Sequence, residues 1–158
     1  MDISVQVVQK DGWDIINYKG PINEETEVHL SHLLQKLGPK CIFNFKSVDF
    51  VNSCGVRGWI NFMRGFEKNR ELVFEECTSE IVMQINMIPS FKGSAKVKSV
   101  YGSYSCEYCG HSQVHLFEEG KNFPANPNDT VEEVNCSNCQ KTMEMEELEE
   151  EFFAFLAS

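Results

Sequence analysis

The stretch that decides the fold is residues 41–59, which read CIFNFKSVDFVNSCGVRGW. Its first part, Cys41 to Phe45, is a nearly continuous apolar run of strand length, which is typical of a strand buried on both faces. From about Gly55 to Asn69 the apolar residues recur at helical spacing instead. One face of this predicted helix carries Val56, Trp59, Ile60, Met63 and Phe66. We therefore expect a central strand, a polar turn and an amphipathic helix in direct succession.

Shorter elements on both sides extend this pattern. Ser4–Val8 and Trp13–Lys19 are β-prone runs joined by Asp11 and Gly12, a dipeptide that favours a tight hairpin turn. Strands and helices then alternate along the chain, which indicates an α/β domain. The leading hairpin makes its sheet mixed. The remaining elements are expected at residues 24–37 (helix), 72–74 (strand), 79–87 (helix) and 97–104 (strand).

Length and composition allow a folded core with a small appendage. The chain has 158 residues, of which 42% are hydrophobic, and disorder would need a leaner composition. We expect an α/β domain over residues 1–100, a unit over 101–142 whose two C-x-x-C pairs are typical of a zinc ribbon, and an acidic amphipathic helix over 143–158.

Four cysteines in the second unit predict a metal site. They form two C-x-x-C pairs, CEYC and CSNC, separated by residues 110–135. Zinc takes four thiolates tetrahedrally, and a two-residue gap lets both sulfurs of one turn reach the same ion. Because four such ligands leave no position for water, the expected zinc site is structural. Its ligands are Cys106, Cys109, Cys136 and Cys139.

The sequence gives less support to a redox role for these cysteines or to a ligand role for the nearby histidines. A redox dithiol would need C-x-x-C at the start of a helix, whereas Gly110 after the first pair suits a knuckle turn. His111 and His115 could replace a ligand, but with four cysteines present we expect surface or strand positions for them.

Charge and cysteine content indicate which partners and which cellular compartment to expect. Fourteen basic and 24 acidic residues give a net charge of -10, and Lys121 and Lys141 are the only basic residues after Cys106. Nucleic-acid binding is therefore not expected, because phosphates need basic partners. No stretch approaches 18 apolar residues, so we expect a cytoplasmic protein without direct membrane insertion. An odd number of cysteines, seven, fits a reducing compartment.

The turn that precedes the second helix is the candidate functional site. Ser53 or Asn52 could cap the helix and satisfy its free backbone N–H groups, which is worth about 1 kcal/mol. Alternatively, Ser53 could be a switch, because a phosphate there would add about -1.5 to -2 charges where the helix dipole favours anions. Both interpretations stay open, and one residue can serve both.

Residues 1 to about 100 resemble a STAS domain, the module shared by sulfate transporters and anti-sigma factor antagonists. The resemblance rests on three segments, IINYKGPIN (15–23), CIFNFKSVDFVNSCGVRGW (41–59) and ELVFEECTSEI (71–81). In the family the middle segment ends in D-[ST]-x-G-[LV], and a partner kinase phosphorylates its hydroxyl in the antagonist branch. The resemblance implies that Ser53 is the phosphoacceptor, while Asn52 stands where the family usually has Asp.

The resemblance further implies a non-enzymatic signalling module that binds a protein partner, such as a kinase or anti-sigma factor. The expected contact surface surrounds Ser53 and comprises Asn52, Cys54, Gly55 and Val56. The alternative is a non-switching STAS subunit of a larger assembly, such as a transporter ATPase complex, which the loss of the Asp carboxylate favours. An enzyme is not expected, because no nucleophile with a neighbouring base is recognisable.

The predicted helix over residues 143–158 has two interpretations. Apolar residues recur at Met145, Leu148, Phe152 and Phe155 or Leu156, with acidic residues between them. The helix could pack on the ribbon or on the α/β domain and leave its acidic face in solvent. It could instead dock a partner, because Phe152, Phe153 and Phe155 cannot all lie on one narrow stripe.

Overall fold

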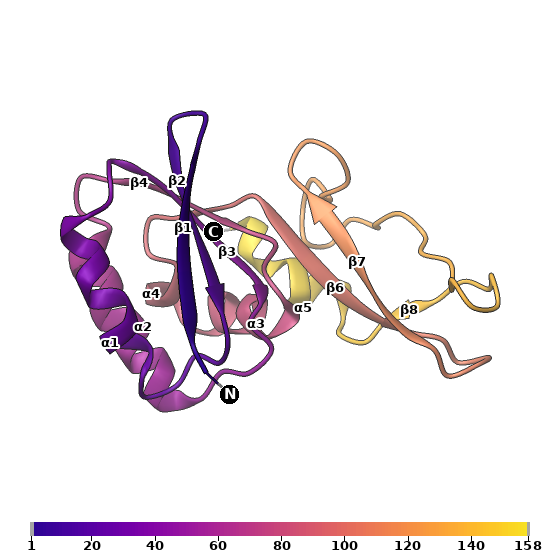
Figure 1. The fold of residues 1–158 in the computed structure, drawn as a ribbon. Helices are drawn as coiled ribbons and strands as arrows, with labels where there is room; N and C mark the ends of the chain where they lie inside the picture. The colour runs from indigo at the N-terminus through magenta and orange to yellow at the C-terminus, as the bar shows by residue number, and fades with distance from the viewer. Residues whose placement is uncertain (1, 158) are drawn as a thin grey trace.

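The first sheet has five strands and is mixed, as predicted. The computed structural model describes residues 2–157. The strands of this sheet are β1 (Ser4–Lys10), β2 (Trp13–Lys19), β3 (Lys40–Ser47), β4 (Glu71–Glu75) and β5 (Lys96–Val97). They lie in the order β1-β2-β3-β4-β5; β1 is antiparallel to β2, and the other neighbours are parallel. This mixed α/β arrangement is consistent with a STAS-like fold (Figure 1).

The hairpin turn between β1 and β2 is the tight turn that the sequence predicts. Asp11 and Gly12 both have positive φ, 54° and 85°, which is the backbone of a type I′ turn. Aspartate tolerates this region better than most residues, and glycine adopts it without strain. The turn fixes a continuous register of seven residue pairs, from Lys10 opposite Trp13 to Ser4 opposite Lys19.

Four helices connect the parallel strands: α1 (Thr26–Ser31), α2 (Ser53–Phe66), α3 (Ser79–Met87) and α4 (Pro89–Lys92). The helix expected over residues 24–37 is shorter than predicted, since α1 gives way to a 3₁₀ turn, η1 (His32–Gln35). The prediction for α3 is confirmed over its whole length. Helix α2 begins earlier than predicted and ends at Phe66, before Asn69, which has a positive φ of 61°.

An aromatic cluster joins α2 to the centre of the sheet. Phe43 of β3 meets Trp59 and Phe66 of α2 edge to face, with ring centroids 5.1 and 5.5 Å apart. The Trp59 indole N–H donates to the Phe91 carbonyl of α4 at 2.8 Å, so this fully buried ring has no unsatisfied polar group. The cluster therefore fixes where α2, and with it the preceding turn, sits on the sheet.

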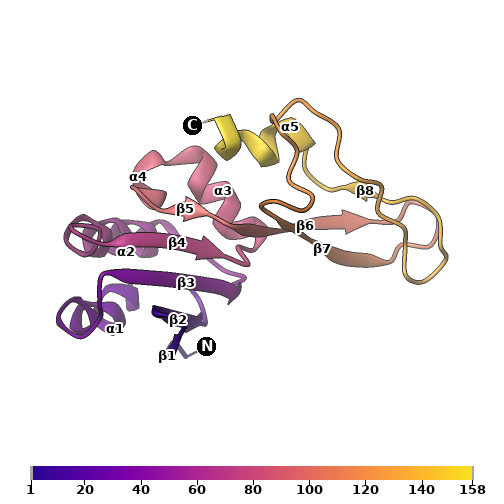
Figure 2. The ribbon, with the colours of Figure 1, turned by 90° about the horizontal axis from the view of Figure 1, so that it is seen from above.

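A second sheet forms the protruding part of the molecule (Figure 2). It consists of β6 (Ser99–Ser105), β7 (Ser112–Glu118) and β8 (Glu144–Met145), in the order β7-β6-β8. The strand expected over residues 97–104 is confirmed over residues 99–104, which run in β6 toward Cys106, but Val97 belongs to β5 of the first sheet. The chain leaves the first sheet after Val97 and enters the second at Ser99, because only two residues of β5 pair with β4.

Backbone hydrogen bonds make the passage between the sheets rigid. The Lys98 N–H donates to Phe74 of β4 at 2.8 Å. Cys77 then pairs with the start of β6, donating to Ser99 at 3.1 Å and accepting from Tyr101 at 2.8 Å. The two sheets are therefore joined through shared hydrogen bonds and not through a flexible linker.

The C-terminal segment is not the long helix expected over residues 143–158. It contributes strand β8, then a short helix α5 (Glu149–Phe152) and a 3₁₀ turn η2 (Phe153–Ala157). Phe152, Phe153 and Phe155 are all buried, at 1%, 0% and 7% exposure. The expectation that the segment packs on the rest of the chain is confirmed, and the alternative that its phenylalanines stay free for a partner is wrong.

The buried phenylalanines of this segment bridge both units. Phe153 lies edge to face with Phe117 of β7, at 5.1 Å between centroids. On the other side, the Asn86 side chain of α3 donates to the Phe152 carbonyl at 2.9 Å. The tail thereby fills the corner between α3 and the second sheet. No helix within residues 2–157 has the length and apolar character needed to cross a membrane.

Candidate switch turn and metal centre

Asn52 is the N-cap of α2. Its Oδ1 accepts the Gly55 backbone N–H at 2.8 Å, while its φ and ψ of -119° and 170° are those of a residue just outside the helix. The amide N–H of the same side chain donates to the Glu24 carboxylate at 3.5 Å. An aspartate would make the first bond but not the second, since a carboxylate cannot donate. Asn52 is therefore matched to the acidic residue that faces it.

Gly55 is required by the close approach of another segment. A Cβ at this position would overlap the backbone carbonyl of Ile22, in the loop that leads to α1. Ile22 is held there by donating to Phe50 at 2.9 Å and accepting from Asn52 at 3.0 Å. These bonds attach the turn to the loop on its inner side, so its outer side is left to face solvent.

Ser53 lies on that outer side, at the first residue of α2. It is exposed, and its hydroxyl makes no hydrogen bond within residues 2–157. Because Asn52 already caps the helix, the Ser53 hydroxyl is free for other chemistry. The neighbouring Cys54 is also exposed, whereas Gly55 and Val56 are buried. Of the predicted contact surface, only the first part of the turn is accessible.

A groove runs from this turn between α2 and α3. Its volume is about 670 Å³. Its apolar lining comprises Val51, Val56, Ile60, Met87 and Ile88, and its polar lining comprises Asn52, Ser53, Arg57, Asn61, Arg64 and Gln84. No acidic side chain lines it, although the whole protein carries a charge of -10.

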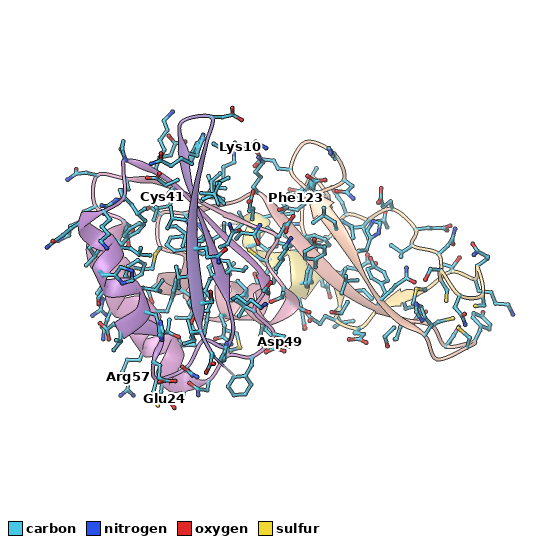
Figure 3. The ribbon with its side chains drawn as sticks, in the orientation of Figure 1. Lys10, Glu24, Cys41, Asp49, Arg57 and Phe123 are labelled. Carbon is cyan, nitrogen blue, oxygen red and sulfur yellow. The ribbon has the colours of Figure 1, made fainter. Side chains whose placement is uncertain are left out.

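The sequence does not predict the groove, although the position of Ile60 on α2 could have indicated it. Ile60 belongs to the apolar face that the sequence predicts for this helix, yet it is half-exposed and forms a wall of the groove. Arg57 and Arg64 are exposed and make no ion pair within residues 2–157. Figure 3 shows Arg57 and Glu24 projecting at the end of the domain where the turn lies. The groove thus combines an apolar floor with two unpaired cations.

The four cysteines come together at the far end of the second sheet, as the sequence predicts for one binding site. Their sulfur atoms all lie within 4.8 Å of one another, with Cys106 to Cys139 at 3.5 Å and Cys109 to Cys136 at 3.6 Å. Four sulfurs placed tetrahedrally at about 2.3 Å from a zinc ion are about 3.8 Å apart. The cluster could therefore hold a metal ion, and its dimensions fit zinc.

Each cysteine pair folds into the same knuckle. The Gly110 N–H donates to Cys106 at 2.9 Å, and the Gln140 N–H donates to Cys136 at 2.8 Å. Gly110 and Gln140 both have positive φ, 77° and 69°, which turns the chain back toward the sulfurs. The common geometry of the two segments indicates that both present their sulfur atoms to one site.

Hydrogen bonds from Asn138 favour the thiolate form of Cys109, whereas the neighbouring sulfurs help to raise the pKa of Cys139 to about 11. The Asn138 side chain donates to Cys109 at 3.4 Å, and the Asn138 backbone N–H donates to Cys136 at 3.4 Å. The Asn138 side chain, followed by a backbone N–H at His111, lowers the pKa of Cys109 to about 6. A thiol that ionises near neutral pH is a better metal ligand than an ordinary cysteine.

The two histidines lie beside the cluster and not in it. The His111 Nε2 atom lies 3.1 Å from the Ser137 hydroxyl, and the His115 Nε2 atom lies 2.6 Å from the Glu132 carboxylate. These contacts cross-link β7 and its preceding turn to the segment that carries the second cysteine pair. The expected surface and strand positions are confirmed.

The other buried cysteines are unsuited to reaction. Burial raises the pKa of Cys41 to about 11, and burial raises the pKa of Cys77 further still. Both therefore stay protonated at neutral pH, and a thiol is a poor nucleophile compared with its thiolate.

The fold and its sites define a mixed α/β domain joined to a second, three-stranded sheet that carries a four-cysteine cluster. No family model matches the sequence, and no curated protein matches it either. Among solved structures, the chain is similar to an anti-sigma factor antagonist from Mycobacterium paratuberculosis. The two share 18% sequence identity over 48% of this chain and 68% of the other, with a TM-score of 0.41.

Proposed function

We propose that this protein is a non-enzymatic interaction module that binds a protein partner at the groove between α2 and α3, and that phosphorylation of Ser53 switches this binding. The observation that carries the proposal is that Asn52 and Ser53 have separate roles in the turn. Asn52 caps the helix, so the exposed Ser53 hydroxyl has no structural duty and lies at the rim of the groove.

A phosphate at Ser53 would change the charge of the groove without disturbing the fold. It would sit at the positive end of the α2 dipole and one turn before Arg57, which suits an anion. The groove has two unpaired arginines and no acidic lining residue, so it favours a partner with acidic residues around an apolar anchor. The phosphate would compete for Arg57 and repel such a partner.

We further propose that the ribbon binds one structural zinc ion through its four cysteines. Zinc would fix the relative position of the two knuckles and supply no reaction, because four thiolates fill its coordination sphere. Elemental analysis of the purified chain should give about one zinc per molecule. A metal-free preparation with the same amide exchange at both knuckles would contradict a structural role.

Binding and phosphosite mapping test the switch. The full chain is used as bait in extracts of its own cells, captured partners are identified, and their affinity is measured with the wild type, Ser53→Ala and Ser53→Glu. We expect Ser53→Glu to weaken binding by about fivefold or more and Ser53→Ala to leave it unchanged. Ser31→Glu places the same charge on an exposed serine of α1 outside the groove and is the matched control.

Incubation with the partner kinase and ATP should then place the phosphate on Ser53. A mark confined to other residues, together with equal affinities for Ser53→Glu and Ser31→Glu, would refute the switch. A stable complex with an ATPase that is indifferent to Ser53→Glu would instead support the alternative, a non-switching subunit of a transporter assembly. Asn52 favours that alternative, since it supplies no carboxylate beside the acceptor.

A further inference from the structure

The outer edge of β1 is unusually open. In Figure 2, β1 lies at the end of the first sheet farthest from the ribbon, with no other element drawn beyond it. Its seven residues pair with β2 in one unbroken register, without a bulge, and the strand contains no proline. Bulges, prolines and inward-pointing charges are the usual means by which proteins protect such an edge from pairing.

The opposite edge of the same sheet is protected. Strand β5 has only two residues, and the chain then turns into β6. The Lys96 ammonium of β5 also pairs with the Glu119 carboxylate from the loop after β7, at 2.9 Å. The contrast between the two edges shows that the fold leaves β1 open while it covers β5.

The hairpin geometry identifies the free backbone groups of β1. In a two-residue hairpin the residues that flank the turn, here Lys10 and Trp13, form a hydrogen-bonded pair. Hydrogen-bonded pairs alternate along the ladder, so the N–H and C=O groups of Val5, Val7 and Gln9 point away from β2. None of these groups has a partner within residues 2–157. Val7 is also 39% exposed.

The charges at the two ends of β1 are complementary to those of a second copy. Lys10 lies at the hairpin end of the strand, as Figure 3 shows, and Asp2 precedes the strand at the other end. In an antiparallel pair related by a two-fold axis at Gln6, Asp2 lies opposite Lys10 of the second copy. The same register places Val5 opposite Val7, and both present free backbone groups. Hydrogen bonding and charge therefore select one register.

We propose that β1 pairs with β1 of a second copy of this chain, so that one continuous sheet runs through a symmetric dimer. The occupant is a second copy because the edge complements itself, with valine opposite valine and a carboxylate opposite an ammonium at each end. The ribbon lies at the other end of the sheet and stays clear of the interface. The inference is independent of any switch at Ser53.

Sedimentation equilibrium of the zinc-loaded full chain over a range of concentrations tests the dimer. The wild type should dimerise with a weak dissociation constant, since an interface of one strand per copy is small. Val7→Pro removes one outward N–H that the β1–β2 ladder does not use, so it should abolish dimerisation while circular dichroism stays unchanged. A wild type that remains a monomer throughout would overturn the proposal, as would a dimer indifferent to Val7→Pro.

A charge exchange tests the register. Lys10→Glu and Asp2→Lys should each raise the dissociation constant by roughly tenfold, because the two-fold axis repeats each lost ion pair. The double variant restores opposite charges and should regain the affinity of the wild type. Failure of the double variant to recover would overturn the proposed register, even if a dimer of another kind persisted.

Discussion

Replacing Asn52 by alanine should lower the free energy of unfolding by about 1 kcal/mol, the usual cost of a lost N-cap. The reason is the 2.8 Å bond between its Oδ1 and the Gly55 N–H, which no other side chain replaces within residues 2–157. For a chain of this length the loss corresponds to a fall of about 2–4 °C in Tm. Ser53→Ala should cost less than about 0.5 kcal/mol, because the Ser53 hydroxyl makes no bond that alanine would lose.

Asn52→Asp should stay close to the wild type, for two opposing reasons. The carboxylate keeps the cap and gains about 0.3–1 kcal/mol from the helix dipole. It also replaces the Asn52 amide, which lies 3.5 Å from the Glu24 carboxylate, with a like charge. Two like charges about 4 Å apart cost about 1 kcal/mol in water. The variant therefore introduces a carboxylate beside Ser53 without a large change in stability, and it can be used to ask whether a kinase needs that charge.

Urea unfolding in zinc-containing buffer, followed by circular dichroism, measures the free energy of unfolding of all three variants. The reasoning fails if Ser53→Ala loses as much stability as Asn52→Ala, because Ser53 would then be a cap and not a free hydroxyl. It also fails if Asn52→Ala is neutral. In either case the assignment of capping to one residue and switching to its neighbour would have to be abandoned.

Three further changes test other parts of the structure. Gly55→Ala should lower the free energy of unfolding by about 1–3 kcal/mol or more, because its Cβ would overlap the Ile22 backbone. Gly65→Ala is the control: its Cβ would have its nearest contact at 3.9 Å, so it should be neutral or stabilising in the same urea titration. Phe153→Ala should cost about 3–5 kcal/mol, whereas Leu148→Ala, at a residue 62% exposed, should cost little in calorimetry. Burial raises the pKa of Cys41 from 9.0 to about 11, so its contribution to stability should persist up to about pH 9 and be lost as the pH rises toward 11. Melting curves across that range should show this fall, and Cys41→Ala should make it smaller.

The sequence predicts those parts of the fold that local chemistry determines. The Asp11-Gly12 turn follows from two residues that accept positive φ, and α2 follows from its apolar period. The clustering of the cysteines follows from their paired spacing. In each case the residues on which the prediction rests are also the residues that form the turn, the helix or the cluster.

The parts that the sequence misses depend on contacts between distant segments. The pattern of residues 143–158 is that of an amphipathic helix, but Met145 pairs with Tyr104 and extends the second sheet instead. The strand break at Lys98 arises because its N–H binds Phe74 of β4 while the following residues pair with β7. The groove exists only because α3 lies beside α2, which no local period encodes.

The way in which the tail closes the molecule has a consequence for synthesis on the ribosome. Helix α3 is translated before the second sheet, yet it is contacted by α5 and η2, which are translated after that sheet. The nascent chain must therefore keep part of α3 uncovered while residues 99–148 emerge. At elongation rates of about 5–20 residues per second this interval lasts several seconds. During that time a chaperone could recognise the exposed helix, and a stop codon anywhere in the ribbon would leave it permanently uncovered.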